Sequence, residues 1–168
     1  MDLVAYALIA VFPLLVIVAA LKDVTSFTIP NWTSLGLIAA FYPAALAVGA
    51  PLGVIGTCSL VGLAALAVGM AMFALNWIGG GDAKLFAATA LWMGWPDVLG
   101  FLMATALAGG ALALLLLQMR SNWLRPYLQR PAWLGRLVTA PDAPYGIAIA
   151  VGALAMLPQS PLVELLAR

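Results

Sequence analysis

Polar residues are confined to short stretches of this chain, and these stretches divide it into long apolar segments. Six such segments stand between polar, proline-rich or glycine-rich breaks: Leu3 to Leu21, Trp32 to Val48, Val54 to Leu75, Ala83 to Trp95, Val98 to Gln118 and Ala143 to Leu157. A bilayer crossing takes about 20 apolar residues, and a backbone in contact with lipid must satisfy its own hydrogen bonds. The pattern therefore predicts an all-α polytopic membrane protein with six transmembrane helices.

The breaks within the two longest apolar stretches carry turn residues. Trp32 to Leu75 and Ala83 to Gln118 are each too long for one crossing, and "GAPLG" (Gly49 to Gly53) and "GWPD" (Gly94 to Asp97) divide them. The fourth and sixth segments are short. We expect them to extend into adjoining loops, to tilt little, or to sit where the bilayer is thinned.

The composition agrees with a membrane protein and excludes several kinds of chemistry. Of the 168 residues, 65% are hydrophobic and 8% are charged, and the mean hydropathy is +1.12. A net charge of +1 with scattered basic residues offers no patch for nucleic acid, and no long polar segment could form a soluble domain, so residues 1–168 are interpreted as one membrane-embedded domain. With one cysteine, Cys58, and no histidine, we expect no intrachain disulfide, no metal site and no histidine-based catalysis.

The basic residues indicate an orientation for a six-span protein. Six of the seven fall in loops on one side, namely Lys22, Lys84, Arg120, Arg125, Arg130 and Arg136, and only Arg168 falls on the other. The positive-inside rule assigns the first side to the cytoplasm, with both termini extracytoplasmic. The arginine-rich loop from residue 120 to 142 also holds aromatic residues, and we interpret it as an interfacial anchor, with substrate docking as the alternative.

The same topology sorts the acidic residues. Asp23, Asp82 and Asp142 lie on the cytoplasmic side, the first two directly at the membrane ends of spans one and four. These two carboxylates can meet if the two helices pack together. Lys22 and Lys84 do not neutralise them locally, because residues one or two apart on a helix do not face each other.

A pair of carboxylates in one site has a definite chemistry. Both cannot ionise cheaply, so one keeps its proton near neutral pH. The ionised member can then take a proton from a water while the protonated member donates to a substrate carbonyl. Peptide hydrolysis by this route needs no metal, cofactor or covalent intermediate.

The motif "NWIGGGDAKLFAA" (Asn76 to Ala88) offers two interpretations for its glycines. Gly79, Gly80 and Gly81 allow positive φ and would let an extended substrate backbone approach Asp82, which can also cap a helix beginning at Ala83. A tight turn with Asp82 as a simple N-cap accounts for the spacing equally well.

Two other aspartates have ordinary explanations when taken alone. "KDVTSFTIPN" around Asp23 could be a polar hairpin turn, with Pro30 starting the second span and Asn31 or Thr33 near its cap. Asp142 is interpreted as a cap for the sixth span, with Pro144 in the first turn, and stays a third catalytic candidate.

Taken together, the motifs resemble those of the type IV prepilin peptidases, membrane aspartic proteases with a GxGD signature. "GGGDAK" (Gly79 to Lys84) matches the glycine-aspartate motif, "D…IPN" (Asp23, then Ile29 to Asn31) matches the first-aspartate motif, and "PYGIAIA" (Pro144 to Ala150) is similar to the last helix of the family. The resemblance covers essentially the whole chain.

The resemblance implies a function and site. Family members cut the short basic leader from prepilins or pseudopilins at the cytoplasmic face of the inner membrane, after a glycine that precedes a hydrophobic helix. Asp23 and Asp82 would be the catalytic pair, Gly79 to Gly81 would shape the substrate site, and Lys84 would be a motif residue at that site. The chain lacks the extra cytoplasmic segment and cysteine tetrad of methylating relatives, so it is similar to the small, cleavage-only form associated with tight-adherence pili.

Two functions from other classes remain as alternatives. A proton-coupled carrier would use acidic residues within the membrane, but it needs polar groups through the bilayer, and spans two, three and five contain almost none. A non-catalytic pilus-assembly component would use the aspartates only as helix caps. The sequence does not indicate an oligomeric state.

Overall fold

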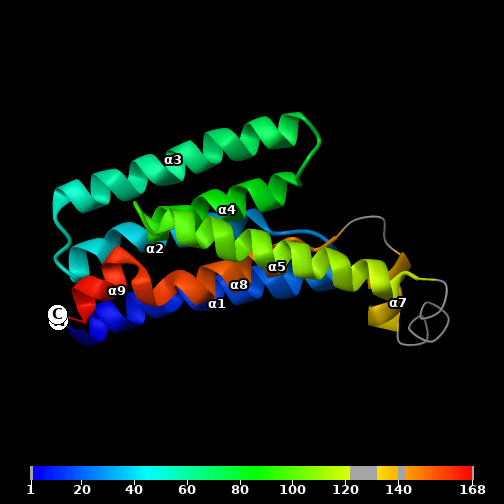
Figure 1. Ribbon diagram of the computed structural model, residues 1–168. Helices are drawn as coiled ribbons and strands as arrows, with labels where there is room; N and C mark the ends of the chain where they lie inside the picture. The colour runs from blue at the N-terminus through cyan, green and yellow to red at the C-terminus, as the bar shows by residue number, and fades with distance from the viewer. Residues whose placement is uncertain (1, 122–131, 140–142, 168) are drawn as a thin grey trace.

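The computed structural model describes residues 2–121, 132–139 and 143–167 of the protein. The elements of these ranges, in chain order, are α1 (Asp2–Ser26), α2 (Asn31–Ala47), α3 (Leu52–Ala74), α4 (Gly80–Met93), α5 (Val98–Met119), α7 (Ala132–Thr139), α8 (Gly146–Met156), the 3₁₀ turn η1 (Leu157–Gln159) and α9 (Pro161–Leu166). Figure 1 shows an elongated bundle with both termini at one end and α7 at the other.

The predicted all-α fold is confirmed for the described residues, and each of the six predicted segments contains helix. Four stretches are long and apolar enough to cross a membrane: Leu3–Ser26, Leu52–Ala74, Val98–Met119 and Gly146–Leu166. The helices of the second and fourth segments are shorter, with 17 residues in α2 and 14 in α4. Six crossings and extracytoplasmic termini therefore stay predictions.

The first helix is longer than its apolar segment. The prediction that it ends at Leu21 is wrong, because α1 continues through Asp23 to Ser26. The hydroxyl of Thr25 donates to the carbonyl of Leu21 at 2.8 Å, and the hydroxyl of Ser26 donates to the carbonyl of Lys22 at 2.6 Å. The polar side chains beyond the apolar run thus find hydrogen-bond acceptors in the preceding turn of the same helix. Asp23 is consequently a helical residue and not part of a hairpin turn.

The last segment begins later and runs further than predicted. Its helix starts at Gly146 instead of Ala143, and helical structure continues past Leu157 through η1 and α9. The backbone N–H of Tyr145 donates to the carbonyl of Ala143 at 2.9 Å, so a tight turn keeps Pro144 outside the helix. The expectation that Pro144 lies in the first turn is therefore wrong.

Both predicted turns are present, and a glycine with positive φ occurs in each. Gly49 has a φ of +70° between α2 and α3, and Gly94 has a φ of +63° at the end of α4. A Cβ at Gly94 would also lie 2.7 Å from the sulfur of Cys58. Only glycine combines this backbone conformation with such a close approach.

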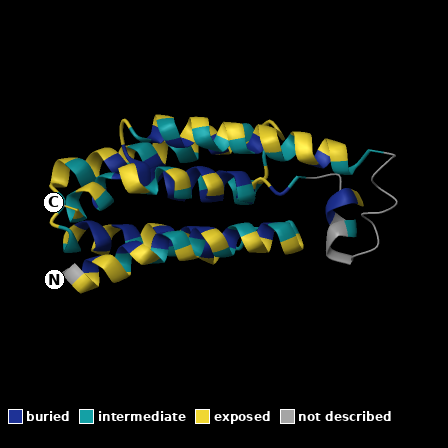
Figure 2. Cartoon of the chain, turned by 60° about the horizontal axis from the view of Figure 1, so that its bottom comes forward, coloured by how far each residue is buried: buried dark blue, intermediate teal, exposed yellow. Residues whose placement is uncertain are grey.

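Helix α4 lies at the centre of the packing. It packs against α2, α3 and α8, while α1 packs against α2 and α8, and α5 packs against α8. Trp92 of α4 is fully buried and donates its indole N–H to the carbonyl of Leu37 at 3.0 Å. Its ring lies 5.0 Å from that of Phe12 and 5.7 Å from that of Phe41. Buried positions face neighbouring helices, and exposed positions follow the outer surfaces (Figure 2).

The contact between α5 and α8 predicts opposite effects for two glycine substitutions. A Cβ at Gly152 would lie 2.8 Å from the backbone nitrogen of Thr105, whereas nothing lies within 4 Å of one at Gly110. We expect Gly152→Ala to lower the free energy of unfolding by about 1–3 kcal/mol through overpacking. Gly110→Ala should raise it by up to about 1 kcal/mol through helix propensity. Thermal unfolding in detergent measures both, and two upward shifts would contradict the close packing at Gly152.

Candidate active site

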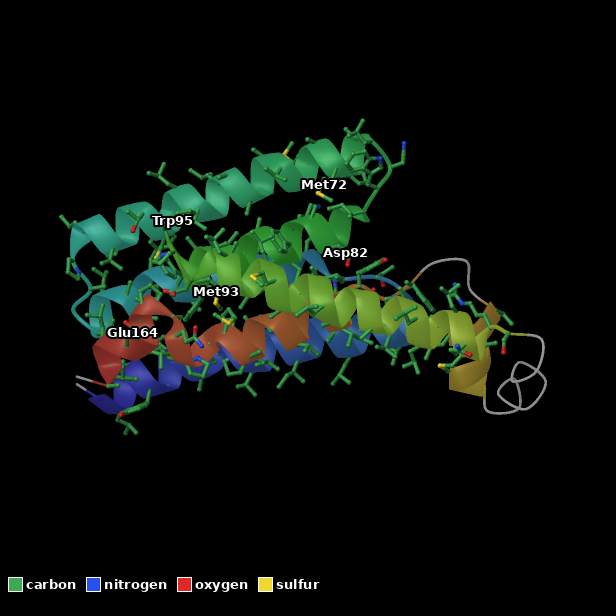
Figure 3. The ribbon with its side chains drawn as sticks, in the orientation of Figure 1. Met72, Asp82, Met93, Trp95 and Glu164 are labelled. Carbon is green, nitrogen blue, oxygen red and sulfur yellow. The ribbon has the colours of Figure 1, made fainter. Side chains whose placement is uncertain are left out.

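Asp23 and Asp82 line one small cavity at the end of the bundle opposite the termini. The cavity has a volume of about 240 Å³ and is completed by residues 27–29 and by Gly79 to Gly81. Figure 3 shows Asp82 at the start of α4, at the opposite end of that helix from Met93. The fold thus brings together the two sequence motifs, which are far apart in the chain.

Asp23 is held by the other end of the chain. It is 6% exposed, and its Oδ2 accepts a hydrogen bond of 2.7 Å from the backbone N–H of Gly146, the first residue of α8. The positive end of the α8 dipole also points at this carboxylate. Both effects stabilise the anion, and burial opposes it. Asp23 is therefore a fixed, oriented carboxylate.

Gly146 is a site residue that the sequence interpretation did not single out. A Cβ there would lie 2.8 Å from Asp23 Oδ2, 3.0 Å from Asp23 Cβ and 3.1 Å from Ile29 Cδ1. Any side chain would push the helix away from the carboxylate it binds. The signal was present in "PYGIAIA", where a glycine opens a helix, but its partner lies 123 positions earlier in the chain.

Asp82 lies in the first turn of α4, in a different position from the one predicted. The helix begins at Gly80 and not at Ala83, and its N-cap is Gly79, so Asp82 is not the N-cap. Its Oδ1 is buried without a hydrogen-bond partner. Burial first, and then the charge of Asp23, raise the pKa of Asp82 to about 6, although hydrogen bonding to the Gly79 backbone lowers it. Asp82 therefore holds its proton to higher pH than an ordinary aspartate.

The three glycines of the motif allow close contact and do not provide unusual backbone angles. Gly79 has a φ of −70°, and Gly80 and Gly81 are helical, so the expectation of positive φ is wrong. Instead, a Cβ at Gly79 would lie 2.9 Å from Asp82 Oδ2, one at Gly80 3.3 Å from the ring of Phe73, and one at Gly81 3.1 Å from Ile29 Cβ. Larger residues would displace the Asp82 carboxyl group or separate α4 from Phe73 and Ile29.

Lys84 connects the two motifs. Its Nζ donates to Asn31 Oδ1 at 3.1 Å, which joins the "IPN" sequence at the start of α2 to the first turns of α4. Asn31 does not cap α2, whose N-cap is Pro30, and the hydroxyl of Thr33 donates to the Pro30 carbonyl at 2.7 Å. The partner of Lys84 is thus an amide near the aspartate cavity.

Phe27 is a second residue of the cavity that sequence reasoning missed. It has a φ of +51°, which is rare for a residue with a large side chain. Its N–H donates to the carbonyl of Asp23 at 2.7 Å, so the chain turns directly after α1. This turn carries Thr28 and Ile29 past the cavity and the start of α4. No simple sequence signal marks a phenylalanine for this conformation.

Two predictions concern residues outside the described ranges. One is that Asp142 caps the sixth span and is a third catalytic candidate. The other is that the arginine-rich loop, most of which is not described, is an interfacial anchor. In the described ranges, no group of three or more His, Cys, Asp or Glu side chains is placed to hold a metal ion.

Comparison with known families and proteins gives a match to a family model. The sequence model described as the type IV leader peptidase family matches residues 10–114, which is more than half of the chain. The matched range includes Asp23, Asp82, Lys84 and the three motif glycines, and it ends before Gly146. No curated protein and no solved structure matches.

The titration of Asp82 predicts a pH-dependent stability. Its pKa is raised to about 6 in the folded protein, against about 3.9 for an unfolded aspartate. The stabilising contribution is therefore complete below about pH 4 and is lost as the pH rises through about 6. We expect the thermal midpoint in detergent to fall over this range, and to fall less in Asp82→Asn, which is neutral throughout. Equal pH dependence in the two proteins would contradict the raised pKa.

Proposed function

Because the chain belongs to the type IV leader peptidase family, we propose that it is an aspartic endopeptidase with Asp23 and Asp82 as its catalytic pair. It removes the basic leader of type IV prepilins or pseudopilins at the cytoplasmic face of the bacterial inner membrane. The observation that carries this proposal is that both aspartates and Gly79 to Gly81 line the same cavity. The metal-free chemistry of a carboxylate pair is the reaction that such a cavity supports.

The surroundings of the two carboxyls support a division of roles. Asp23 is the general base, since the backbone N–H of Gly146 orients its Oδ2 and favours the anion, although burial opposes ionisation. Asp82 is the general acid, since its Oδ1 lacks a hydrogen-bond donor and its pKa is raised to about 6. Asp23 takes a proton from a water that attacks the scissile carbonyl carbon, and Asp82 donates its proton to the carbonyl oxygen. Asp23 then gives its proton to the leaving nitrogen, the C–N bond breaks, and Asp82 takes back the hydroxyl proton, which releases the leader as a carboxylic acid and the new N-terminus as an amine.

The remaining motif residues have proposed roles in substrate binding. The glycines Gly79, Gly80 and Gly81 leave the cavity wall without side chains, so an extended peptide can approach Asp82 closely. Lys84, fixed by Asn31, lies at the edge of this surface. All four are on or beside the first turn of α4, which is also the turn that carries the acid.

The proposed topology has six crossings, with α2 and α4 as short ones. The cavity lies at the end opposite both termini, as do the α1–α2 and α3–α4 connections. Lys22 and Lys84 also belong to that end, close to Asp23 and Asp82 in the chain. A cytoplasmic assignment for this end agrees with the positive-inside rule.

Single substitutions of the aspartates test the chemistry. Asn keeps the size of each side chain but neither donates nor accepts the catalytic proton, so Asp23→Asn and Asp82→Asn should each lower kcat by about 10²-fold or more. The measurement is the product mass after incubating purified protein with a prepilin in detergent, with and without a metal chelator. Asp97→Asn, at the N-cap of α5 and beyond the C-terminal end of α4, is the matched control and should cut normally. Normal cleavage by either site variant would refute the catalytic pair.

Gly146→Ala tests whether the contact from α8 positions the base. The added methyl group displaces Asp23 or α8, and a shift of about 1 Å can cost up to about 10²-fold in rate. We expect kcat to fall by at least about 10-fold while the substrate KM changes little. Gly110→Ala, in open space on α5, controls for a glycine-to-alanine change. Equal activity of the two variants would show that Asp23 does not need this contact.

A further inference from the structure

A second and larger cavity lies beside the aspartates. It is a groove of about 670 Å³ whose walls are α2 and α3 and whose floor is α4. In Figure 1, α3 stands apart from α2 with α4 between them. At the far end, the hydroxyl of Tyr42 lies 3.4 Å from the hydroxyl of Ser59, which joins the two walls. The groove is therefore closed at one end and continues toward the aspartates at the other.

The walls of the groove are apolar and exposed. Leu35 and Ile38 of α2 face Leu63 and Met70 of α3, and these side chains are between 39% and 63% exposed. The floor consists of small residues, including Ala83 and Ala87, which are four apart on one face of α4. Small residues allow another helix to approach closely within a membrane.

The groove adjoins the aspartate cavity. Gly80 lines both of them, and the ring of Phe73 lies over it at the boundary. Lys84 donates to Asn31 across the near end, so polar groups occur where the groove meets the cavity. A chain that leaves the groove at this end passes Phe73 and Gly80 and then lies beside the cavity of Asp23 and Asp82.

We propose that this groove binds the apolar helix that follows the scissile bond of the substrate, an inference that rests on the proposed function. The wall from Asn31 to Tyr42 measures about 16 Å at ~1.5 Å per residue, which matches about three helical turns. A helix seated there would lay one face against the walls and floor. Its preceding residues would pass Gly80 in an extended form and present the peptide bond to the aspartates. A lipid acyl chain has no polar group for the Lys84 and Asn31 end and gains nothing from the neighbouring aspartate cavity.

Filling the groove should affect only substrates that have the helix. Leu63→Trp adds bulk to an exposed wall position without removing core packing, and Leu60→Trp adds it to an exposed position of α3 outside the groove. The probes are a full prepilin in lipid vesicles and a soluble peptide that contains only its leader and cut site. We expect Leu63→Trp to lower kcat/KM about 10-fold or more for the prepilin and less than about 2-fold for the peptide. Leu60→Trp should leave both unchanged.

A second measurement does not depend on turnover. In the Asp82→Asn background, Met70→Cys should form a disulfide with a cysteine placed in the prepilin helix, and Leu60→Cys should not. The native Cys58 is fully buried and does not compete. If wild type cuts the prepilin but Leu63→Trp also cuts it normally and both cysteines crosslink equally, the groove is filled by lipid and the inference is wrong. If wild type cuts neither probe while Met70→Cys crosslinks, the proposed peptidase chemistry fails and the docking surface stands.

Discussion

The hydrogen bond from Gly146 to Asp23 is the interaction on which the rest of the site depends. It joins the last long segment to the first across 123 positions and satisfies a carboxylate inside an apolar bundle. A buried charge without a partner is expensive, so α1 and α8 must meet at this point. The absence of a Cβ at Gly146 makes the meeting possible. Helix α5 then packs on α8, with Gly152 against Thr105, and completes that side of the bundle.

Helix α4 contributes to both the core and the site, although it is shorter than α1, α2, α3 and α5. Its C-terminal half contributes Trp92 to the aromatic cluster, where the indole N–H finds an acceptor in Leu37. Its N-terminal turn contributes the motif glycines and Asp82 to the cavity. Because one rigid helix links the two, packing at Trp92 sets where Asp82 lies. A site on a rigid element is held more accurately than one on a loop.

Asp82 and Asp23 differ in the hydrogen-bond donors around their carboxyl groups. One carboxyl has a hydrogen-bond donor from the end of a helix, while the other has a buried oxygen without one and a pKa raised to about 6. Two chemically identical groups with different surroundings are what an acid and a base in one cavity require. The cost is a less stable folded state when Asp82 ionises, as often occurs where function and stability compete.

The sequence by itself determined that each apolar segment contains a helix, where the turns within the two longest stretches lie, and which residues make up the two aspartate motifs. Apolar block length and the glycine and proline breaks are local properties, so the breaks at Gly49 to Gly53 and Gly94 to Asp97 could be predicted directly. Only the tertiary structure decided that Gly146 binds Asp23, that Lys84 binds Asn31, and that the motif glycines serve close contacts instead of positive φ. Most of these contacts join residues that are distant in the chain. A local sequence pattern does not indicate which distant residue will lie beside a given position.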